Sequence, residues 1–274
     1  MFSRLSKSVE PSCLFDVDEK ESINLIQDLS RTSLLQVRVS QTRRILESAY
    51  EVDFEVFKEK TVTLVYNMSK DDLPAVRQEI CRHLGDLAGF LIQKDPEEGS
   101  TCVISSFLPL VKTFLKDTDS RVRESACEAL VNLSAHLRWR SLSPVLSLVL
   151  SVIHGSDGRD VRCVASALMN GLAITVGRDI CLSFFVPQIQ CLAEDSDPYV
   201  RRSVVENLLE VCNAIGENAT SSKLLPTYRK LCKDSEWIIR RSVTENLPNF
   251  LMTIKPSLRC SFINTLKDLL NDVH

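Results

Sequence analysis

The stretch DSDPYVRRSVVENLLEVCNAIG, residues 195–216, contains the pattern that decides the fold. It opens with the turn-forming run Asp195-Ser-Asp-Pro198, continues with the pair Val200-Arg201, and closes at Gly216. Apolar residues then follow the three-four spacing that places one apolar stripe on a helix. They are Val204, Val205, Leu208, Val211, Cys212 and Ile215. Because Gly often ends a helix in a left-handed conformation, the stretch predicts one amphipathic helix that stops at its glycine.

The same pattern recurs along the chain. Its most regular feature is an Arg that follows Val or Ile, here called the marker arginine. The markers are Arg38, Arg77, Arg123, Arg162, Arg201 and Arg240. Four of the five steps between them are 39 residues and the step from Arg77 to Arg123 is 46, a regularity typical of a solenoid of helix pairs. The seven extra residues can be placed in KDPEEGST, which predicts a long loop near 94–101.

The phase of this repeat predicts an all-α, right-handed solenoid of about six helix pairs and one unpaired C-terminal helix. The expected pairs are 18–30 with 35–50, 55–70 with 74–93, 101–116 with 120–137, 143–154 with 160–176, 179–193 with 198–215, and 221–233 with 236–253. A last helix is expected over 257–271. Residues 1–18 are expected to be poorly ordered, and residues 19–274 to form a single array whose last repeat is incomplete. Proline recurs fourteen residues before the marker, at Pro109, Pro187 and Pro226, and is expected near a helix start, where a missing N–H costs least.

Composition excludes several classes of protein. Apolar residues make up 44% of the 274 residues and charged residues 25%, which are the proportions of a globular protein. The net charge of −3 disfavours a nucleic-acid-binding surface over the whole chain. No stretch approaches 18 uninterrupted apolar residues, so no membrane-spanning helix is expected, and the N-terminus lacks the apolar core of a signal peptide. These features predict a cytoplasmic protein that is also possible in the nucleus.

Cysteines and histidines give no support to a metal site or to catalysis. None of the ten cysteines forms a C-x-x-C pair, and we interpret them as small buried apolar residues in a reducing compartment. None of the four histidines is followed by Glu, and no Gly-rich phosphate loop or G-x-S-x-G motif is present. The sequence therefore predicts a protein that is not an enzyme, with no catalytic residue, metal or cofactor.

The order of Pro, Asp and Val-Arg in helix pairs of 39 residues resembles HEAT repeats over roughly residues 20–274. Three runs look like consecutive central repeats of the scaffold (A) subunit of serine/threonine protein phosphatase 2A. They are VRCVASALMNGLAITVGRDI, FFVPQIQCLAEDSDPYVRRSVVENLLEVCNAIG and LLPTYRKLCKDSEWIIRRSVTENLPNFL. The uniform period, the Gly177-Arg-Asp after the fourth pair and Trp237 in the turn of the sixth carry this resemblance.

The resemblance implies a non-catalytic scaffold whose intra-repeat turns form one ridge. In that family, turns of early repeats hold a regulatory subunit and turns of late repeats hold the catalytic subunit. Trp237 matches the first repeat of the catalytic-subunit end, although Ile238 stands where the family tends to have Arg. The chain corresponds to less than half of the family's array. Its last helix has no partner after it, so we expect a fragment, a truncated relative or a chain whose end docks on something.

Stacked turns predict two sets of functional positions. The first is a partner-binding ridge, because Trp, Tyr and Arg are enriched at interface hot spots; the alternative is that Tyr199 and Trp237 only pack on neighbouring turns. The ridge residues are Arg121, Arg159, Pro198, Tyr199, Glu236 and Trp237. The second set is a structural ladder between adjacent repeats, in which an Asp six residues before the marker also suits a helix N-cap. The ladder residues are Asp71, Arg77, Asp117, Arg123, Arg162, Asp195, Arg201, Asp234 and Arg240.

Three other functions compete with a phosphatase scaffold. A HEAT-repeat adaptor or nuclear-transport-type binding protein would have longer, less uniform repeats and an acidic inner face. A HEAT-like metal hydroxylase would need His-Glu pairs, and a DNA glycosylase a basic concave face with a catalytic carboxylate. The strict spacing and the missing motifs favour the scaffold, with phosphatase subunits as partners and neither nucleic acid nor membrane among them.

Overall fold

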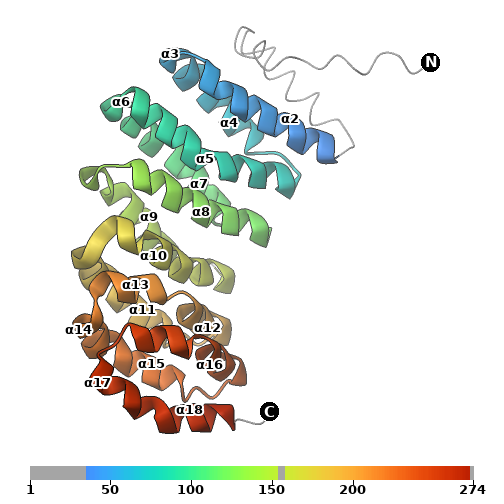
Figure 1. Cartoon of the computed structure of the whole chain (residues 1–274). Helices are drawn as coiled ribbons and strands as arrows, with labels where there is room; N and C mark the ends of the chain where they lie inside the picture. Colours follow the sequence, from blue (N-terminus) through green and yellow to red (C-terminus); the bar gives the residue numbers. More distant parts are fainter. Residues whose placement is uncertain (1–34, 154–157, 272–274) are drawn as a thin grey trace. The chain divides into compact units, whose positions relative to one another are not determined.

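The computed structural model describes residues 35–153 and 158–271, and these residues form helices joined by short turns, without a strand among them (Figure 1). The fold is therefore all-α, as the sequence predicts. The expected N-terminal segment 1–18 and first helix 18–30 lie outside the described residues. The chain divides into two compact units, residues 1–138 and 139–274, so the single array over 19–274 stays a prediction.

The first unit consists of two layers of helices. Its helices are α2 (Leu35–Ser48), α3 (Phe54–Val56), α4 (Val62–Met68), α5 (Pro74–Lys94), α6 (Pro96–Cys102), α7 (Leu108–Phe114) and α8 (Ser120–His136). The second helices of the pairs form one layer, in which α5 packs against α2 on one side and α8 on the other. The first helices α4 and α7 pack against α5 and α8 respectively. Observed helix bounds agree with the predicted ones within a few residues.

The second unit repeats this arrangement. Its helices are α9 (Ser143–Ile153), α10 (Arg159–Ile180), α11 (Val186–Leu192), α12 (Pro198–Glu206), α13 (Leu209–Ile215), α14 (Glu217–Ala219), α15 (Leu225–Leu231), α16 (Trp237–Met252), α17 (Pro256–Arg259) and α18 (Ile263–Leu270). The second helices again lie next to each other, with α10 packed against α12 and α13, and these in turn against α16. Helix α18 packs against α16.

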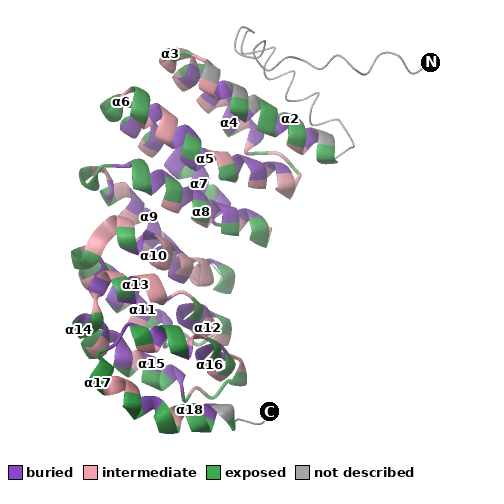
Figure 2. Ribbon diagram, in the orientation of Figure 1, coloured by how far each residue is buried: buried purple, intermediate pink, exposed green. Residues whose placement is uncertain are grey.

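The apolar stripe that defines the repeat is the core of both units (Figure 2). In the repeats that follow the first, positions three, seven and fourteen residues after the marker are buried in both, for example Ile80, Leu84 and Leu91 in α5, except that Val176 in α10 is half-buried. One described segment, Arg159–Leu192, is long and apolar enough to cross a membrane by length and composition alone. It is not one straight helix, because Gly177 adopts φ 78 and ψ 176 within it and separates two helices of consecutive repeats.

The recurring prolines are the second residues of α7, α11 and α15, as the sequence predicts, but each of these α-helices continues directly from a π turn. Four first helices contain a five-residue π turn, at Phe57–Thr61, Val103–Phe107, Cys181–Phe185 and Thr220–Leu224, whereas α9 is a plain α-helix. Pro109, Pro187 and Pro226 come two residues after three of these turns, so each lies inside the continuous run of π turn and α-helix. A proline there cannot donate to the carbonyl four residues earlier and would collide with it. The wider turn, in which the Leu108 N–H donates to the Val103 carbonyl instead, accommodates the ring.

The predicted loop near 94–101 is helical instead. Helix α5 continues to Lys94, and the Asp95 carboxylate then caps α6 by accepting hydrogen bonds from the N–H groups of Glu97 and Glu98 at 2.9 and 2.8 Å. Helix α5 is three residues longer than the equivalent stretch from the start of α12 to the end of α13, and α6 is four residues longer than α14. The seven extra residues thus add about one turn to each helix, because a single capping Asp followed by Pro is enough to start a new helix.

The helix predicted over 198–215 is broken, which is a second correction. Asn207 leaves the helical region at φ −123 and ψ 44, and its side-chain N–H donates to the Ser203 carbonyl at 2.9 Å. The Glu210 N–H, which a continuous helix would direct to residue 206, donates to the Asn170 side chain on α10 at 2.8 Å. Gly216 does have the expected positive φ, 80°, but its ψ of 165° is extended and not that of a left-handed helical residue.

Candidate protein-binding surface

The turn that precedes each second helix is built around the Asp six residues before the marker. Its carboxylate accepts the backbone N–H two residues later, at 2.8 Å in Asp71, 2.9 Å in Asp117, 2.8 Å in Asp195 and 3.0 Å in Asp234. This closes an Asx turn. The helix N-caps are the residues two positions further on, such as Asp119 and Asp197, so the predicted N-cap role of the earlier Asp is wrong. The reason is that the first carboxylate is already committed to the turn.

The marker arginine links its own turn to the next repeat. Its Nη1 donates to the backbone carbonyl of the Asp in the same turn at 2.8 Å, in Arg77, Arg123, Arg201 and Arg240. In the described residues four markers, Arg38 among them, also bind the corresponding carboxylate of the following repeat. The pairs are Arg77–Asp117 at 2.7 Å, Arg162–Asp195 at 2.8 Å and Arg201–Asp234 at 2.8 Å. The fourth pair joins Arg38 to Asp71.

These ion pairs are largely removed from solvent. The side chains of Arg201 and Asp234 are 14% and 10% exposed. Burial opposes ionisation of Asp234, but the hydrogen bonds from Arg201 and from the turn outweigh burial, so the pKa of this carboxyl lies below its ordinary value. The same balance lowers the pKa of Asp117 and Asp195. The ladder is thus charged at neutral pH, and its residues are occupied in holding repeats together.

The ridge residues occupy the same turns but, except for Pro198, are more exposed than the ladder residues. Tyr199, at the start of α12, is 49% exposed, and Trp237, at the start of α16, is 46% exposed. The guanidinium of Arg159, at the start of α10, lies over the Tyr199 ring at 4.8 Å from its centroid. Because α10, α12 and α16 pack side by side, these three side chains extend along one edge of the second unit. This edge thus carries a cation–π pair and, at the start of the next second helix, the exposed ring of Trp237; Trp, Tyr and Arg are the residue types enriched at hot spots.

The other predicted ridge residues differ in their surroundings. Pro198 is half-buried as the first residue of α12, and Glu236 is exposed beside Trp237. Arg121 belongs to the first unit, where its guanidinium binds the N-cap Asp119 at 2.9 Å and remains mostly exposed. The structure therefore brings Arg159, Pro198, Tyr199, Glu236 and Trp237 to one unit, and Arg121 to the other.

Two exposed features were not predicted. Trp139, in the short helix Trp139–Ser141, is 76% exposed, although nothing in its sequence context fits the repeat. An open hollow in the first unit lies between Tyr50 and His136, which are 86 residues apart and on different helices. Only the packing of α2, α5 and α8 brings these two residues near each other, so no local motif could have identified the hollow.

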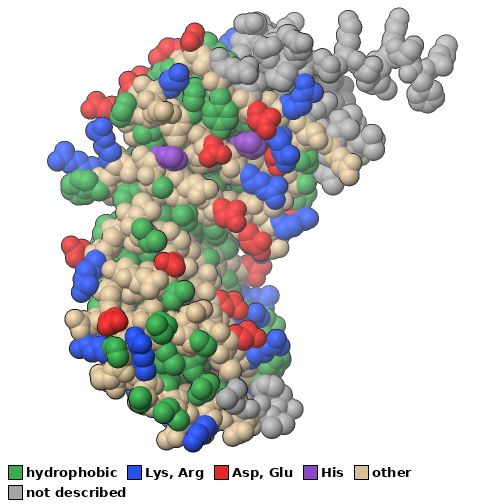
Figure 3. Space-filling view, in the orientation of Figure 1, with side chains coloured by type: hydrophobic (Ala, Val, Ile, Leu, Met, Phe, Trp, Pro, Cys, Tyr) green, Lys and Arg blue, Asp and Glu red, His purple; other side chains and the backbone are tan. Residues whose placement is uncertain are grey.

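Charges on the surface do not concentrate in one place. Figure 3 shows Lys and Arg side chains interspersed with Asp and Glu on the displayed face of each unit. Among the described residues no group of three or more His, Cys, Asp or Glu has the geometry of a metal site. Glu79 and His83 do lie together, at 3.4 Å, but Glu79 also binds Arg43 at 2.6 Å and Arg82 at 3.3 Å. A carboxylate held by two guanidinium groups is a structural anchor.

Comparison with known proteins matches this architecture. A family model described as HEAT repeat matches residues 107–137, which contain α7 and α8. The chain has the HEAT-repeat fold. A crystal structure of Kap121p has a TM-score of 0.56 and 14% identity, covering 96% of this chain and 27% of that one. The crystal structure of the karyopherin Kap121p bound to the SUMO protease Ulp1p has a TM-score of 0.56 and 14% identity. This match covers 97% of this chain and 25% of that one.

An engineered protein is also similar, with a TM-score of 0.41 and 14% identity, covering 85% of this chain and 99% of that one. A search of curated protein sequences finds no match. The chain spans about a quarter of the length of the Kap121p chains that it matches. At these identities the likeness establishes the fold, and the resemblance to the phosphatase 2A scaffold stays a prediction.

Proposed function

We propose that this chain is a non-catalytic scaffold of a type 2A-like serine/threonine protein phosphatase. It holds the catalytic subunit, a regulatory subunit or both on the turn ridge of the second unit. The proposal assigns no catalytic residue and requires no metal or cofactor. Nine thiol cysteines among the described residues suit the reducing cytoplasm or nucleus, where such complexes would assemble.

The single observation that carries the proposal is the exposed cluster of Arg159, Tyr199 and Trp237. These residues occupy the variable positions of three successive turns, while the ladder residues of the same turns are committed to the fold. Large aromatic rings that lie about half in water gain free energy when a partner covers them. The cluster therefore supplies what the phosphatase resemblance requires of the ridge, a binding surface on the turns.

The mechanism would be geometric. A rigid row of turns that holds two partners converts their encounter into an intramolecular event, and so raises the effective concentration of substrate at the catalytic subunit. The ladder contributes by keeping adjacent turns in register, because marker arginines such as Arg77 and Arg201 tie two turns together.

A second candidate is a HEAT-repeat adaptor of the nuclear-transport type, which the likeness to Kap121p favours. Structures of that protein include complexes with Ste12p, Ulp1p and the extreme C-terminus of the phosphatase Cdc14p. An adaptor of this kind would use its second-helix layer to bind partner segments. The two candidates differ in the binding surface, which is the turn ridge for the scaffold and the second-helix layer for the adaptor. They also differ in the proteins expected to bind.

Affinity purification from native lysate followed by mass spectrometry tests both candidates. The wild-type chain is compared with Trp237→Ala and with Trp139→Ala, a matched control that removes the other exposed tryptophan. We expect phosphatase catalytic or regulatory subunits with the wild type and the control, and their loss with Trp237→Ala. Recovery of no phosphatase subunit by the wild type would overturn the leading proposal, and recovery of transport cargo and nucleoporins in their place would favour the second candidate.

A further inference from the structure

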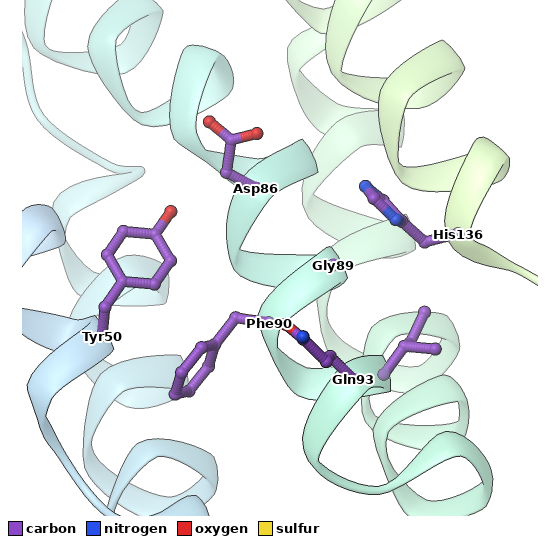
Figure 4. A pocket seen from close by; sticks show the side chains of 7 residues that line it. Tyr50, Asp86, Gly89, Phe90, Gln93 and His136 are labelled. Atoms are coloured by element: carbon purple, nitrogen blue, oxygen red, sulfur yellow. The ribbon is translucent and has the colours of Figure 1, made fainter.

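An open hollow on the first unit has the features of a binding site for one side chain. It is open to solvent, has a volume of about 550 Å³ and is lined by residues of three helical segments. Figure 4 shows Tyr50 on one side, His136 on the other, and Asp86 projecting between them from α5. Tyr50 belongs to the short helix Ala49–Glu51 that follows α2, and His136 is the last residue of α8. The hollow therefore lies across the layer of second helices, away from the turns.

A glycine keeps the hollow open. A Cβ at Gly89 would lie 2.9 Å from two atoms of the His136 ring, closer than such contacts normally occur. Any other residue at this position of α5 would displace the imidazole or fill the space beside it. Gly within a helix costs stability relative to Ala, and here it leaves room next to Asp86, Phe90 and Gln93.

The Asp86 carboxylate has no cationic partner among the described residues. Arg82, one turn earlier on the same helix, donates to Glu79 instead, at 3.3 Å. Asp86 is exposed at the rim of the hollow, and Glu47 on α2 adds a second negative charge nearby. The pKa of Tyr50 is raised to about 12, first by burial and then by the charges of these two carboxylates. The Tyr50 phenol, already protonated at neutral pH, therefore keeps its O–H for hydrogen bonding at alkaline pH as well.

Aromatic rings form the opposite wall. The Tyr50 and Phe90 rings meet edge to face, with 5.5 Å between their centroids. The Phe57 ring also packs on Phe90, with 5.2 Å between the centroids. The Lys94 ammonium lies 5.3 Å from the Phe90 centroid, which is a cation–π contact. An unpaired carboxylate, a phenol and an aromatic wall thus surround one space.

We propose that this hollow binds an arginine side chain presented by an extended segment of a partner protein. A guanidinium can form two parallel hydrogen bonds with the Asp86 carboxylate while its face lies against Tyr50 or Phe90. Gln93 and His136 supply further acceptors for the remaining N–H groups. A lysine ammonium, which is a hydrated point charge without a planar face, satisfies fewer of these groups. The proposal rests on the chain's being a protein-binding scaffold, but on neither partner in particular.

Fluorine NMR of the full chain tests the proposal directly. The sequence has four tyrosines, so 3-fluorotyrosine gives few signals, and Tyr50→Phe assigns that of Tyr50. The probe is N-acetyl-L-arginine methylamide. We expect a saturable shift of the Tyr50 signal with a Kd on the order of millimolar, as a single side chain allows. The neutral citrulline analogue should give no saturable shift, and the lysine analogue should bind more weakly.

Two variants complete the experiment. Asp86→Asn should raise the Kd at least tenfold, while Asp268→Asn, which removes the same charge from an exposed position on α18, should leave it unchanged. No saturable shift with the arginine probe, equal binding by Asp86→Asn, or equal binding of the citrulline analogue would overturn the proposal. Because no phosphatase subunit takes part, this outcome is independent of the purification experiment that tests the ridge.

Discussion

The two units contain the same ladder but different turns. Arg77–Asp117 in the first unit and Arg201–Asp234 in the second have nearly equal N–O distances, 2.7 and 2.8 Å, and equal side-chain exposure, 14% and 10%. The positions beside them differ: the turn before α5 presents Pro74 and Ala75, whereas the turn before α12 presents Pro198 and Tyr199. One short turn therefore separates residues that hold repeats together from residues that are available to a partner, within a few positions of each other.

The largest expected effect comes from breaking the ladder. Asp234→Ala removes the carboxylate that pairs with Arg201 and also opens the Asx turn to Glu236. Loss of one partner of a largely buried pair should lower the free energy of unfolding by about 3 kcal/mol, measured by urea denaturation. Glu245→Ala removes the partner of Arg241 in an exposed pair on α16 and should cost under about 1 kcal/mol. Equal effects of the two substitutions would contradict a structural ladder.

Lowering the pH should remove the ladder's contribution to the free energy of unfolding. The folded-state pKa of Asp234 is below its ordinary value, so its stabilising effect is complete above the unfolded pKa of about 3.9 and is lost as pH falls through the folded pKa. The difference between the unfolding free energies of wild type and Asp234→Asn should thus be constant between about pH 5 and 7 and should shrink towards zero below about pH 4. A difference that persists at the lowest pH would show that the carboxylate charge is not the cause.

The next largest loss of stability is expected from substituting the glycines that end second helices. Gly177 and Gly216 lie 39 residues apart and adopt φ 78 and 80 with extended ψ, a region that other residues rarely enter. Alanine at either position should cost about 2 kcal/mol. Gly158→Ala is the matched control, because Gly158 has φ −58 and nothing lies within 4 Å of a Cβ there. The melting temperature of each variant measures the difference, and a neutral Gly216→Ala would disprove the backbone requirement.

The smallest expected effect is at the break in the α12–α13 helix. Asn170→Ala leaves the Glu210 N–H without the side-chain acceptor that it has at 2.8 Å, and should cost about 1 kcal/mol. Asn132→Ala, an exposed asparagine on α8, should cost less. Amide hydrogen exchange at Glu210 gives a local readout: its protection should fall in Asn170→Ala, and unchanged protection would mean that this bond does not close the break.

The period and the apolar stripe were enough to predict the fold, since Val204, Val211 and Ile215 are buried where the spacing places them. Interruptions were not predictable. The break at Asn207 depends on Asn170 of the neighbouring helix, and the π turns let prolines sit where the propensity of a plain helix excludes them. The insertion after α5 became helix because one Asp-Pro pair outweighed the loop-like composition around it.

The candidate sites likewise include some residues that the sequence predicts and others that it does not. Ladder positions follow from the repeat phase, because equivalent residues of adjacent repeats must stack. The Arg159–Tyr199 contact joins residues 40 positions apart and depends on which way each side chain turns. The hollow beside Asp86 depends on an absent side chain, that of Gly89, and on the end of α8. Sequence patterns identify positions that repeat, and single deviations from the repeat appear only in the folded chain.

The central claim is that ladder residues hold the fold while exposed turn residues select the partner. Isothermal titration of a type 2A catalytic subunit into wild type and Trp237→Ala, with each variant's unfolding free energy measured in parallel, tests this claim most directly. We predict at least tenfold weaker binding by Trp237→Ala, an unfolding free energy within about 1 kcal/mol of wild type, and unchanged binding by Trp139→Ala. Unchanged affinity of Trp237→Ala, or a loss of binding that follows its loss of stability, would contradict it.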